Sequence, residues 1–234
     1  MKRRTFLQIS GLGLSGSILG CNSDGPNAAH ALLKWVERKN ESVERVIFRH
    51  DAVDRVRRGA RAAGNAFPKY YISRALPVWD ESVRGVWRLD VSGAVRRPMQ
   101  LTLAELEQLP RRTQRVNHYC VEGWTAVATW SGVLLSQLAR LVQPTSDAAY
   151  VDFQSFDSGY HESWDIDSAL HPQTLIAYGM DGRYLGAAHG APARLHSPVK
   201  LGYKNTKYLT RIVFLPRRNG GYWSDRGYEW FAGV

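Results

Sequence analysis

Short runs of alternating apolar and polar residues, separated by glycine and proline turns, fill most of this chain of 234 residues after residue 66. Such alternation is typical of half-buried strands. Residues 101–106 and 134–142 in this part have a helical pattern, and Ala169 and Leu170 are expected in a short turn or helix. In the first of these segments Thr102 and Glu105 have the spacing of a capping box. Strands with few helices and no regular β-α-β rhythm predict an α+β fold. The expected strands are residues 69–73, 87–93, 115–119, 149–153, 175–178, 194–196 and 209–215.

The chain is long enough for one large domain or two small ones. We expect three parts: an export signal over residues 1–21, a tether with a helical segment over residues 22–66, and the main domain over residues 67–234. In the second part apolar residues recur at helical spacing from residue 30, and we expect the helical pattern to reach residue 61. The arginines near its end form either a solvated helix face or a patch for a phosphate or a partner: Arg55, Arg57, Arg58 and Arg61.

The formal net charge is +10. Lys2, Arg3 and Arg4 contribute three of these charges, and the remaining 28 basic and 21 acidic residues leave +7 after residue 21. A nucleic-acid-binding protein has such a balance, but no RNP, zinc-finger or basic-helix motif accompanies it here. The charge also suits a domain that binds an anionic cofactor and faces an anionic membrane surface, so we expect no nucleic-acid partner.

The first residues have the pattern of a targeting segment. Arg3 and Arg4 precede a glycine-rich apolar run over residues 9–20, which is too short for a permanent membrane-spanning helix. This is typical of a twin-arginine export signal, a route that carries proteins already folded. Residues 18–21 are similar to a lipoprotein processing box that ends at Cys21. Either Cys21 carries a lipid anchor or the signal is cleaved nearby.

Cys120 is the only cysteine besides Cys21, so it has no partner for a disulfide inside the main domain. A single cysteine among polar and aromatic residues is an inert core residue, a nucleophile or a metal ligand. Gly123 beside Trp124 predicts a tight turn that lets the backbone approach another group. Glu122 is open to two interpretations, an exposed acid or a group behind the site.

Several stretches, in order along the chain, resemble the molybdopterin domain of the sulfite oxidase family and, within it, the periplasmic methionine-sulfoxide-reductase branch. The resemblance covers residues 67–231. It rests on residues 119–124 (YCVEGW), 130–133 (WSGV), 156–160 (FDSGY) and 189–195 (HGAPARL), followed by Pro198, residues 202–204 (GYK) and residues 207–208 (KY). It implies an exported oxidoreductase with a molybdenum–molybdopterin cofactor.

The resemblance also implies roles for individual residues. Cys120 matches the cysteine whose sulfur binds molybdenum, and a thiolate is a soft ligand that suits a redox metal. An arginine, a lysine and loop amides are suited to a buried phosphate. His189 is otherwise a core histidine, and Arg194 and Lys207 are otherwise members of surface ion pairs. The residues that match cofactor-binding positions are Tyr71, Ser73, Cys120, Ser155, His189, Arg194, Asn205, Thr206 and Lys207.

Two departures from the family pattern bear on the substrate and the assembly. Sulfite-oxidising members place arginines beside the metal-binding cysteine, whereas residues 121–124 here are Val, Glu, Gly and Trp. A neutral, partly apolar oxo substrate therefore fits better than sulfite. The chain ends at Val234 without the family's C-terminal dimerisation domain, so we expect a monomer, with the aromatic tail over residues 220–231 as a docking or capping segment.

The resulting hypothesis is oxygen-atom transfer, most simply reduction of an S-oxide of a small molecule or of an oxidised protein side chain. Residues 1–234 contain no Cys-x-x-Cys-His haem motif, so electrons are expected from a membrane haem or quinol partner at the periplasmic face. The alternatives are sulfite-type oxidation with a cytochrome as acceptor, and a non-catalytic lipoprotein on the same scaffold.

Overall fold

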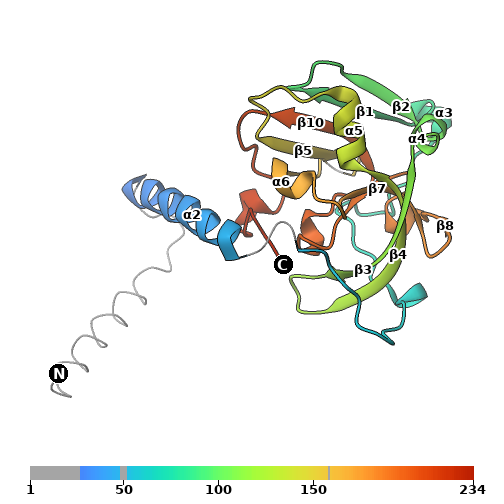
Figure 1. Ribbon diagram of the computed structural model, residues 1–234, viewed down its shortest axis with the longest axis horizontal. Helices are drawn as coiled ribbons and strands as arrows, with labels where there is room; N and C mark the ends of the chain where they lie inside the picture. Colours follow the sequence, from blue (N-terminus) through green and yellow to red (C-terminus); the bar gives the residue numbers. More distant parts are fainter. Residues whose placement is uncertain (1–26, 48–51, 158) are drawn as a thin grey trace. The chain divides into compact units, whose positions relative to one another are not determined.

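A computed structural model describes residues 27–47, 52–157 and 159–234. The chain divides into two compact units, residues 1–47 and residues 48–234. The described part of the first unit is one helix, α2 (Asn27–Ile47) (Figure 1). The predicted export signal and Cys21 lie outside the described residues. No helix within the described ranges is long and apolar enough to cross a membrane.

The second unit contains two five-stranded sheets. The first has the order β2-β1-β10-β5-β6. Its only parallel pair is β1 with β10, which joins segments far apart in the sequence; the other neighbours are antiparallel. The strands are β1 (Arg88–Gly93), β2 (Met99–Thr102), β5 (Tyr150–Ser155), β6 (His161–Asp165) and β10 (Leu209–Leu215).

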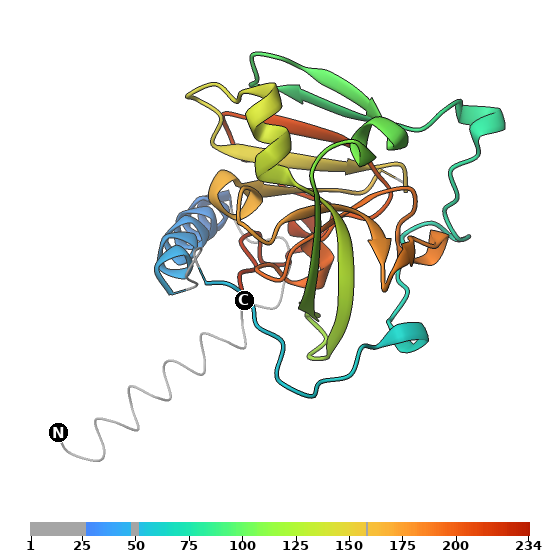
Figure 2. The ribbon, with the colours of Figure 1, turned by 45° about the vertical axis from the view of Figure 1, so that its right-hand side comes forward.

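The second sheet is antiparallel and has the order β3-β4-β7-β8, with β9 also paired to β7. Its longest strands form a hairpin whose turn contains Cys120, and residues 52–66 pass along this hairpin (Figure 2). The strands are β3 (Arg111–Tyr119), β4 (Thr125–Leu134), β7 (Leu175–Met180), β8 (Arg183–Tyr184) and β9 (Arg194–His196).

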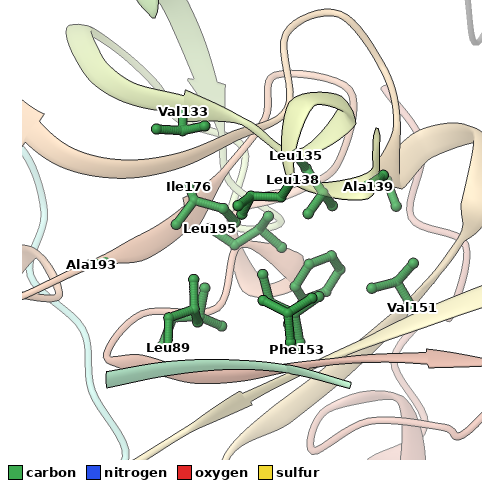
Figure 3. Packing of buried hydrophobic residues seen from close by; sticks show 14 of the residues in the cluster. Leu89, Val133, Leu135, Leu138, Ala139, Val151, Phe153, Ile176, Ala193 and Leu195 are labelled. Atoms are coloured by element: carbon green, nitrogen blue, oxygen red, sulfur yellow. The ribbon is translucent and has the colours of Figure 1, made fainter. Parts of the chain in front are cut away.

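The helices of this unit are short. They are α3 (Glu81–Arg84), α4 (Leu103–Glu107), α5 (Leu135–Val142) and α6 (Ile166–Ala169), with the 3-10 turns η1 (Gly64–Ala66), η2 (Ala187–His189), η3 (Gly202–Lys204) and η4 (Ser224–Arg226). The larger apolar core joins Leu89 and Phe153 of the first sheet to Leu138 of α5 and to Ile176 and Leu195 of the second sheet (Figure 3). This core fixes the two sheets against each other.

The α+β prediction is confirmed, and several elements appear where the sequence places them. β10 has the predicted bounds, and Thr102 begins α4 with the predicted capping box. β2, β4, β6 and β8 were not predicted, since their residues do not stand out as alternating runs between turns.

Two local predictions are wrong. Residues 69–73 are not a strand, because the backbone N–H groups of Ile72 and Ser73 donate to the Asp157 carboxylate instead of to a neighbouring strand. Residues 52–61 are not helical: the N–H of Asp54 donates to the Gln173 side chain, and the segment follows the β3–β4 hairpin.

Candidate active site

A cavity of about 350 Å³ opens beside the turn of the β3–β4 hairpin. Six separate stretches of the second unit surround it, so that it exists only in the folded chain. Aromatic rings make up much of its wall. The lining residues that matter below are Tyr70, Tyr71, His118, Cys120, Glu122, Trp124, Ser155, Asp157, Tyr160, Arg194, Asn205, Lys207, Trp223 and Tyr228.

Cys120 reaches the cavity because the hairpin turns immediately after Tyr119. The Cys120 N–H donates to the Trp124 carbonyl at 2.9 Å, and the Gly123 N–H donates to the Cys120 carbonyl at 3.0 Å. Gly123 has a φ of +85°, a conformation that favours glycine, so the predicted tight turn is confirmed. The thiol is partly exposed and lines the cavity, so the interpretation of Cys120 as an inert core residue is wrong.

Burial and the Glu122 carboxylate raise the pKa of the Cys120 thiol, while backbone N–H groups of the turn act in the opposite direction. The protein alone therefore favours the protonated thiol. A bound metal cation would favour the thiolate, since the sulfur of a coordinating cysteine is deprotonated.

Glu122 lies at the lip of the cavity and is held by two aromatic residues. Its Oε2 accepts hydrogen bonds from the Trp124 indole N–H at 2.9 Å and from the Tyr70 hydroxyl at 3.1 Å, and it lies 3.9 Å from the Cys120 sulfur. These bonds, that of Trp124 first, lower the pKa of Glu122. The carboxylate is thus solvent-accessible and also adjacent to the thiol, so both interpretations of Glu122 apply in part.

Arg194 is a buried cation with 3% of its surface exposed. Its guanidinium donates to three backbone carbonyls, those of Leu195 at 3.2 Å, His189 at 3.1 Å and Asn205 at 3.3 Å, and lies 4.9 Å from the Trp130 ring centre. Within the described ranges it has no carboxylate partner, so the alternative of a surface ion pair is wrong. Burial lowers its pKa to about 10, which leaves it charged at neutral pH.

Lys207 is a second cation on the cavity wall. Its Nζ donates to the Ala188 carbonyl at 2.9 Å and lies 5.1 Å from the Tyr208 ring centre. Burial, followed by repulsion from Arg194, lowers the pKa of Lys207 to about 7, although Asp157 opposes this. Gly190 leaves room for the Lys207 side chain, because a Cβ at position 190 would lie 2.9 Å from the Lys207 Cβ.

The other predicted site residues fall into two groups. Tyr71, Ser155 and Asn205 line the cavity with Cys120, Arg194 and Lys207, whereas Ser73, His189 and Thr206 do not. Ser73 donates from its N–H to Asp157 at 2.9 Å. Thr206 is fully buried.

His189 is partly buried and does not line the cavity. Its ring packs on Phe67 with a centroid distance of 5.6 Å, and its Nδ1 has no partner within the described part of the chain. Burial, and after it the charge of Arg194, lowers the pKa of His189 to about 4, so the imidazole is neutral at pH 7.

The prediction of site residues missed His118, which lines the cavity one strand position before Tyr119. His118 is buried, and its Nδ1 lies 3.4 Å from His196 Nε2. Burial lowers its pKa to about 3. Trp223 and Tyr228 in the aromatic tail also line the cavity, so this tail closes one of its sides, as the capping interpretation predicted. The richness of the tail in aromatic residues was the available signal.

Comparison with known proteins decides the family. Residues 75–223 match the family described as oxidoreductase molybdopterin binding domain. The chain belongs to this family. It is a molybdopterin-dependent oxidoreductase, and the predicted resemblance, enzyme class and molybdenum–molybdopterin cofactor are confirmed.

Three similar curated proteins are all named as subunits of a protein-methionine-sulfoxide reductase. The chain is 38% identical over 240 residues to the provisionally named protein-methionine-sulfoxide reductase subunit YedZ1 of Azospira oryzae, covering 99% of this chain and 87% of that protein. It is 30% and 36% identical to the protein-methionine-sulfoxide reductase catalytic subunits MsrP of Campylobacter jejuni and Xanthomonas campestris. These two alignments cover 63% and 59% of this chain and 56% and 48% of the relatives, so the chain spans about half the length of each MsrP.

Among solved structures, the sulfane dehydrogenase SoxCD of Paracoccus pantotrophus matches with a TM-score of 0.54 and 21% sequence identity. The match covers 56% of this chain and 39% of the SoxCD chain. At this identity the likeness concerns the fold, and it agrees with the predicted sulfite-oxidase-like architecture.

Proposed function

We propose that this protein reduces an S-oxide, with its molybdenum–molybdopterin cofactor held in the cavity beside Cys120. The observation that carries the proposal is the convergence of the Cys120 thiol and two cations, Arg194 and Lys207, on one cavity, where neither cation forms an ion pair with a carboxylate of the described residues. A thiolate suits the metal, and one buried and one partly buried cation suit a phosphate; the cofactor has both groups.

Arg194 and Lys207 are the residues that would bind the phosphate of the cofactor. A buried charge without an opposite charge is costly, and a phosphate bound between Arg194 and Lys207 would relieve that cost. The carbonyls that accept from the guanidinium hold it in place in advance, so that little ordering is needed on binding. Asn205 supports this loop by accepting the Ser197 N–H at 2.6 Å and donating to the Lys200 and Leu201 carbonyls.

The remaining predicted residues fall into two roles in this proposal. Tyr71 and Ser155 contact the cofactor from the cavity wall, whereas Ser73, His189 and Thr206 support the wall from behind. Within the described ranges no three His, Cys, Asp or Glu residues gather to hold a metal ion. In this proposal the protein's ligand to the metal is the Cys120 sulfur.

The reaction converts a sulfoxide, two protons and two electrons into a sulfide and water. The bound cofactor supplies the oxygen-atom transfer. The protein orients the substrate between aromatic rings of the cavity, chiefly Trp124, Tyr160 and Trp223, where the sulfur and its alkyl groups find apolar partners. Electrons come from a membrane haem or quinol partner on the outer face of the cytoplasmic membrane. The predicted export signal supports this placement, and the relatives' names, which call them subunits, suit a separate partner protein.

Glu122 favours a neutral substrate. Its carboxylate is held near the Cys120 sulfur, at the site where an anionic substrate such as sulfite would have to approach. Two negative charges close together repel each other, although water screens part of this repulsion because Glu122 is exposed. Sulfite oxidation is disfavoured for this reason.

The first test is to purify the protein from cells that make the cofactor, to measure its molybdenum and pterin, and to compare two assays. Reduction of methionine sulfoxide by a reduced dye is expected to be faster than oxidation of sulfite with an artificial acceptor. Active protein without molybdenum, or sulfite as the better substrate, would contradict the proposal.

A second test isolates the charge of Glu122. In Glu122→Gln, sulfate and sulfite are expected to inhibit sulfoxide reduction at roughly tenfold lower concentrations, because one repulsive charge is gone. Glu81→Gln removes an equal charge from an exposed helix outside the cavity and serves as the matched control. If sulfate and sulfite inhibit the two variants equally, the charge of Glu122 does not exclude anions from the cavity.

A further inference from the structure

The first unit presents an apolar helix face that the cofactor chemistry does not use. Six large apolar side chains of α2 are between 38% and 80% exposed: Leu32, Trp35, Val36, Val43, Val46 and Ile47. With about 100° between successive residues of an α-helix, all six fall within a stripe roughly 120° wide. We call these six residues the α2 stripe.

The opposite side of the helix is polar. Glu41 lies about 180° around the helix from Leu32, and it pairs with Arg45 at 2.8 Å one turn further on. A helix of 21 residues with one apolar and one charged side lies at the boundary between water and an apolar medium. We propose that α2 binds a membrane surface, with its stripe inserted among the lipid acyl chains and its axis parallel to the membrane.

A second copy of the chain is a poorer occupant of this face. In a coiled coil, apolar residues would repeat at the a and d positions of each heptad. In the most apolar register Leu32 and Val46 fall at d and Val36 and Val43 fall at a, but Lys39 occupies the d position between them. A charge in the middle of the seam disfavours self-association, whereas at a lipid surface the lysine can extend to the headgroups.

Lys39 fits the lipid interface. It is the one charged residue within the angular range of the stripe, and its Nζ lies 5.8 Å from the Trp35 ring centre. A lysine can extend its ammonium to the headgroups while its methylene groups remain among apolar atoms, and tryptophan is favoured at the same depth.

The surrounding charge fits anionic lipid. Residues 27–61 contain nine lysines and arginines and five acidic residues, a net charge of +4. Four of these arginines follow the helix in the larger unit, at positions 55, 57, 58 and 61, and all four are exposed. Basic residues next to an amphipathic helix add electrostatic attraction to phosphatidylglycerol. The proposal depends neither on the cofactor nor on lipidation of Cys21.

Vesicle flotation tests the proposal with the cofactor-loaded full-length chain carrying Cys21→Ser, so that no acyl chain contributes. This protein is expected to float with vesicles that contain phosphatidylglycerol. Val43→Lys places a charge in the stripe and is expected to weaken binding at least about tenfold, since burial of one such apolar side chain is worth about that factor or more. Ser42→Lys adds the same charge one residue earlier, about 100° around the helix, and is expected to bind as well or better.

Both variants add a positive charge, so purely electrostatic binding would strengthen in both, and that result would overturn the insertion of the stripe. Absence of flotation by the parent protein would also overturn it. So would a dimer in sedimentation experiments that Val43→Lys dissociates, because the stripe would then face a second copy. Quenching by bromine-labelled lipids, taken as the difference between the parent and Trp35→Phe, is expected to place Trp35 in the interface.

Discussion

Lys207 offers the sharpest test of the cation pair, because its effect on stability should change sign when the cofactor is bound. Burial and Arg194 lower its pKa from 10.5 to about 7. In the unfolded chain the pKa returns to its ordinary value, so the unfolded state binds the proton more strongly. The charged lysine therefore destabilises the cofactor-free fold below pH 7, and this cost declines as the pH rises toward 10.5.

The magnitude follows from the pKa change. At about 1.4 kcal/mol for each pKa unit, the full cost below pH 7 is on the order of 5 kcal/mol. Since Lys207 keeps some contact with water, we expect about half of this, ~2–3 kcal/mol. Replacement by methionine also removes the hydrogen bond to the Ala188 carbonyl, worth roughly 1 kcal/mol at every pH.

We therefore expect Lys207→Met to stabilise the cofactor-free protein by ~1–2 kcal/mol at pH 6 and to lose this advantage by pH 9–10. Urea unfolding followed by tryptophan fluorescence measures both values. In the loaded enzyme the same variant should retain cofactor about 10- to 100-fold less tightly, because a charged hydrogen bond to the phosphate is lost. If Lys207→Met destabilises the cofactor-free protein equally at both pH values, burial in the cavity does not disfavour the charged form of Lys207.

Three further substitutions test other parts of the structure. Cys120→Ser should abolish molybdenum retention, measured by elemental mass spectrometry, and change the free energy of unfolding by less than about 1 kcal/mol because the thiol is partly exposed. Gly132→Ala should destabilise the second sheet by ~3 kcal/mol or more, since the new Cβ would lie 2.1 Å from a backbone oxygen of β7, whereas Gly186→Ala, which meets nothing within 4 Å, is the control. Glu162→Gln leaves the buried Lys204 ammonium without its carboxylate at 2.6 Å and should cost roughly 3–5 kcal/mol in urea unfolding.

Local signals in the sequence were sufficient where a segment satisfies its own backbone. α4 begins at Thr102 because that side chain and Glu105 cap each other's N–H groups, an interaction of residues three apart. The β10 strand alternates from Ile212 to Leu215 because one face meets the core, although its register with β5 shifts between Leu209 and Arg211. Such elements need no knowledge of distant residues.

Prediction failed where distant groups provide the hydrogen bonds. Residues 69–73 have a strand-like pattern, yet Asp157, which is far away in the sequence, accepts the N–H groups of Ile72 and Ser73. His118 was missed because a histidine on an alternating strand gives no sign of its surroundings. Its place in the cavity depends on η3, where Gly202 leaves room for the imidazole: a Cβ there would lie 2.7 Å from His118 Nε2.

The sequence alone determined the class of the fold, the strand that leads to Cys120, the turn at Gly123 and the family pattern that points to molybdopterin. These depend on periodicity and on short motifs, which a linear chain already contains. The tertiary structure decided that Arg194 and Lys207 lie beside the thiol without a carboxylate partner in the described residues. It did so because the pairing of β9 with β7 buries Arg194, while Lys207, which is partly buried, lies on the wall of the same cavity, and burial cannot be read from charge or spacing.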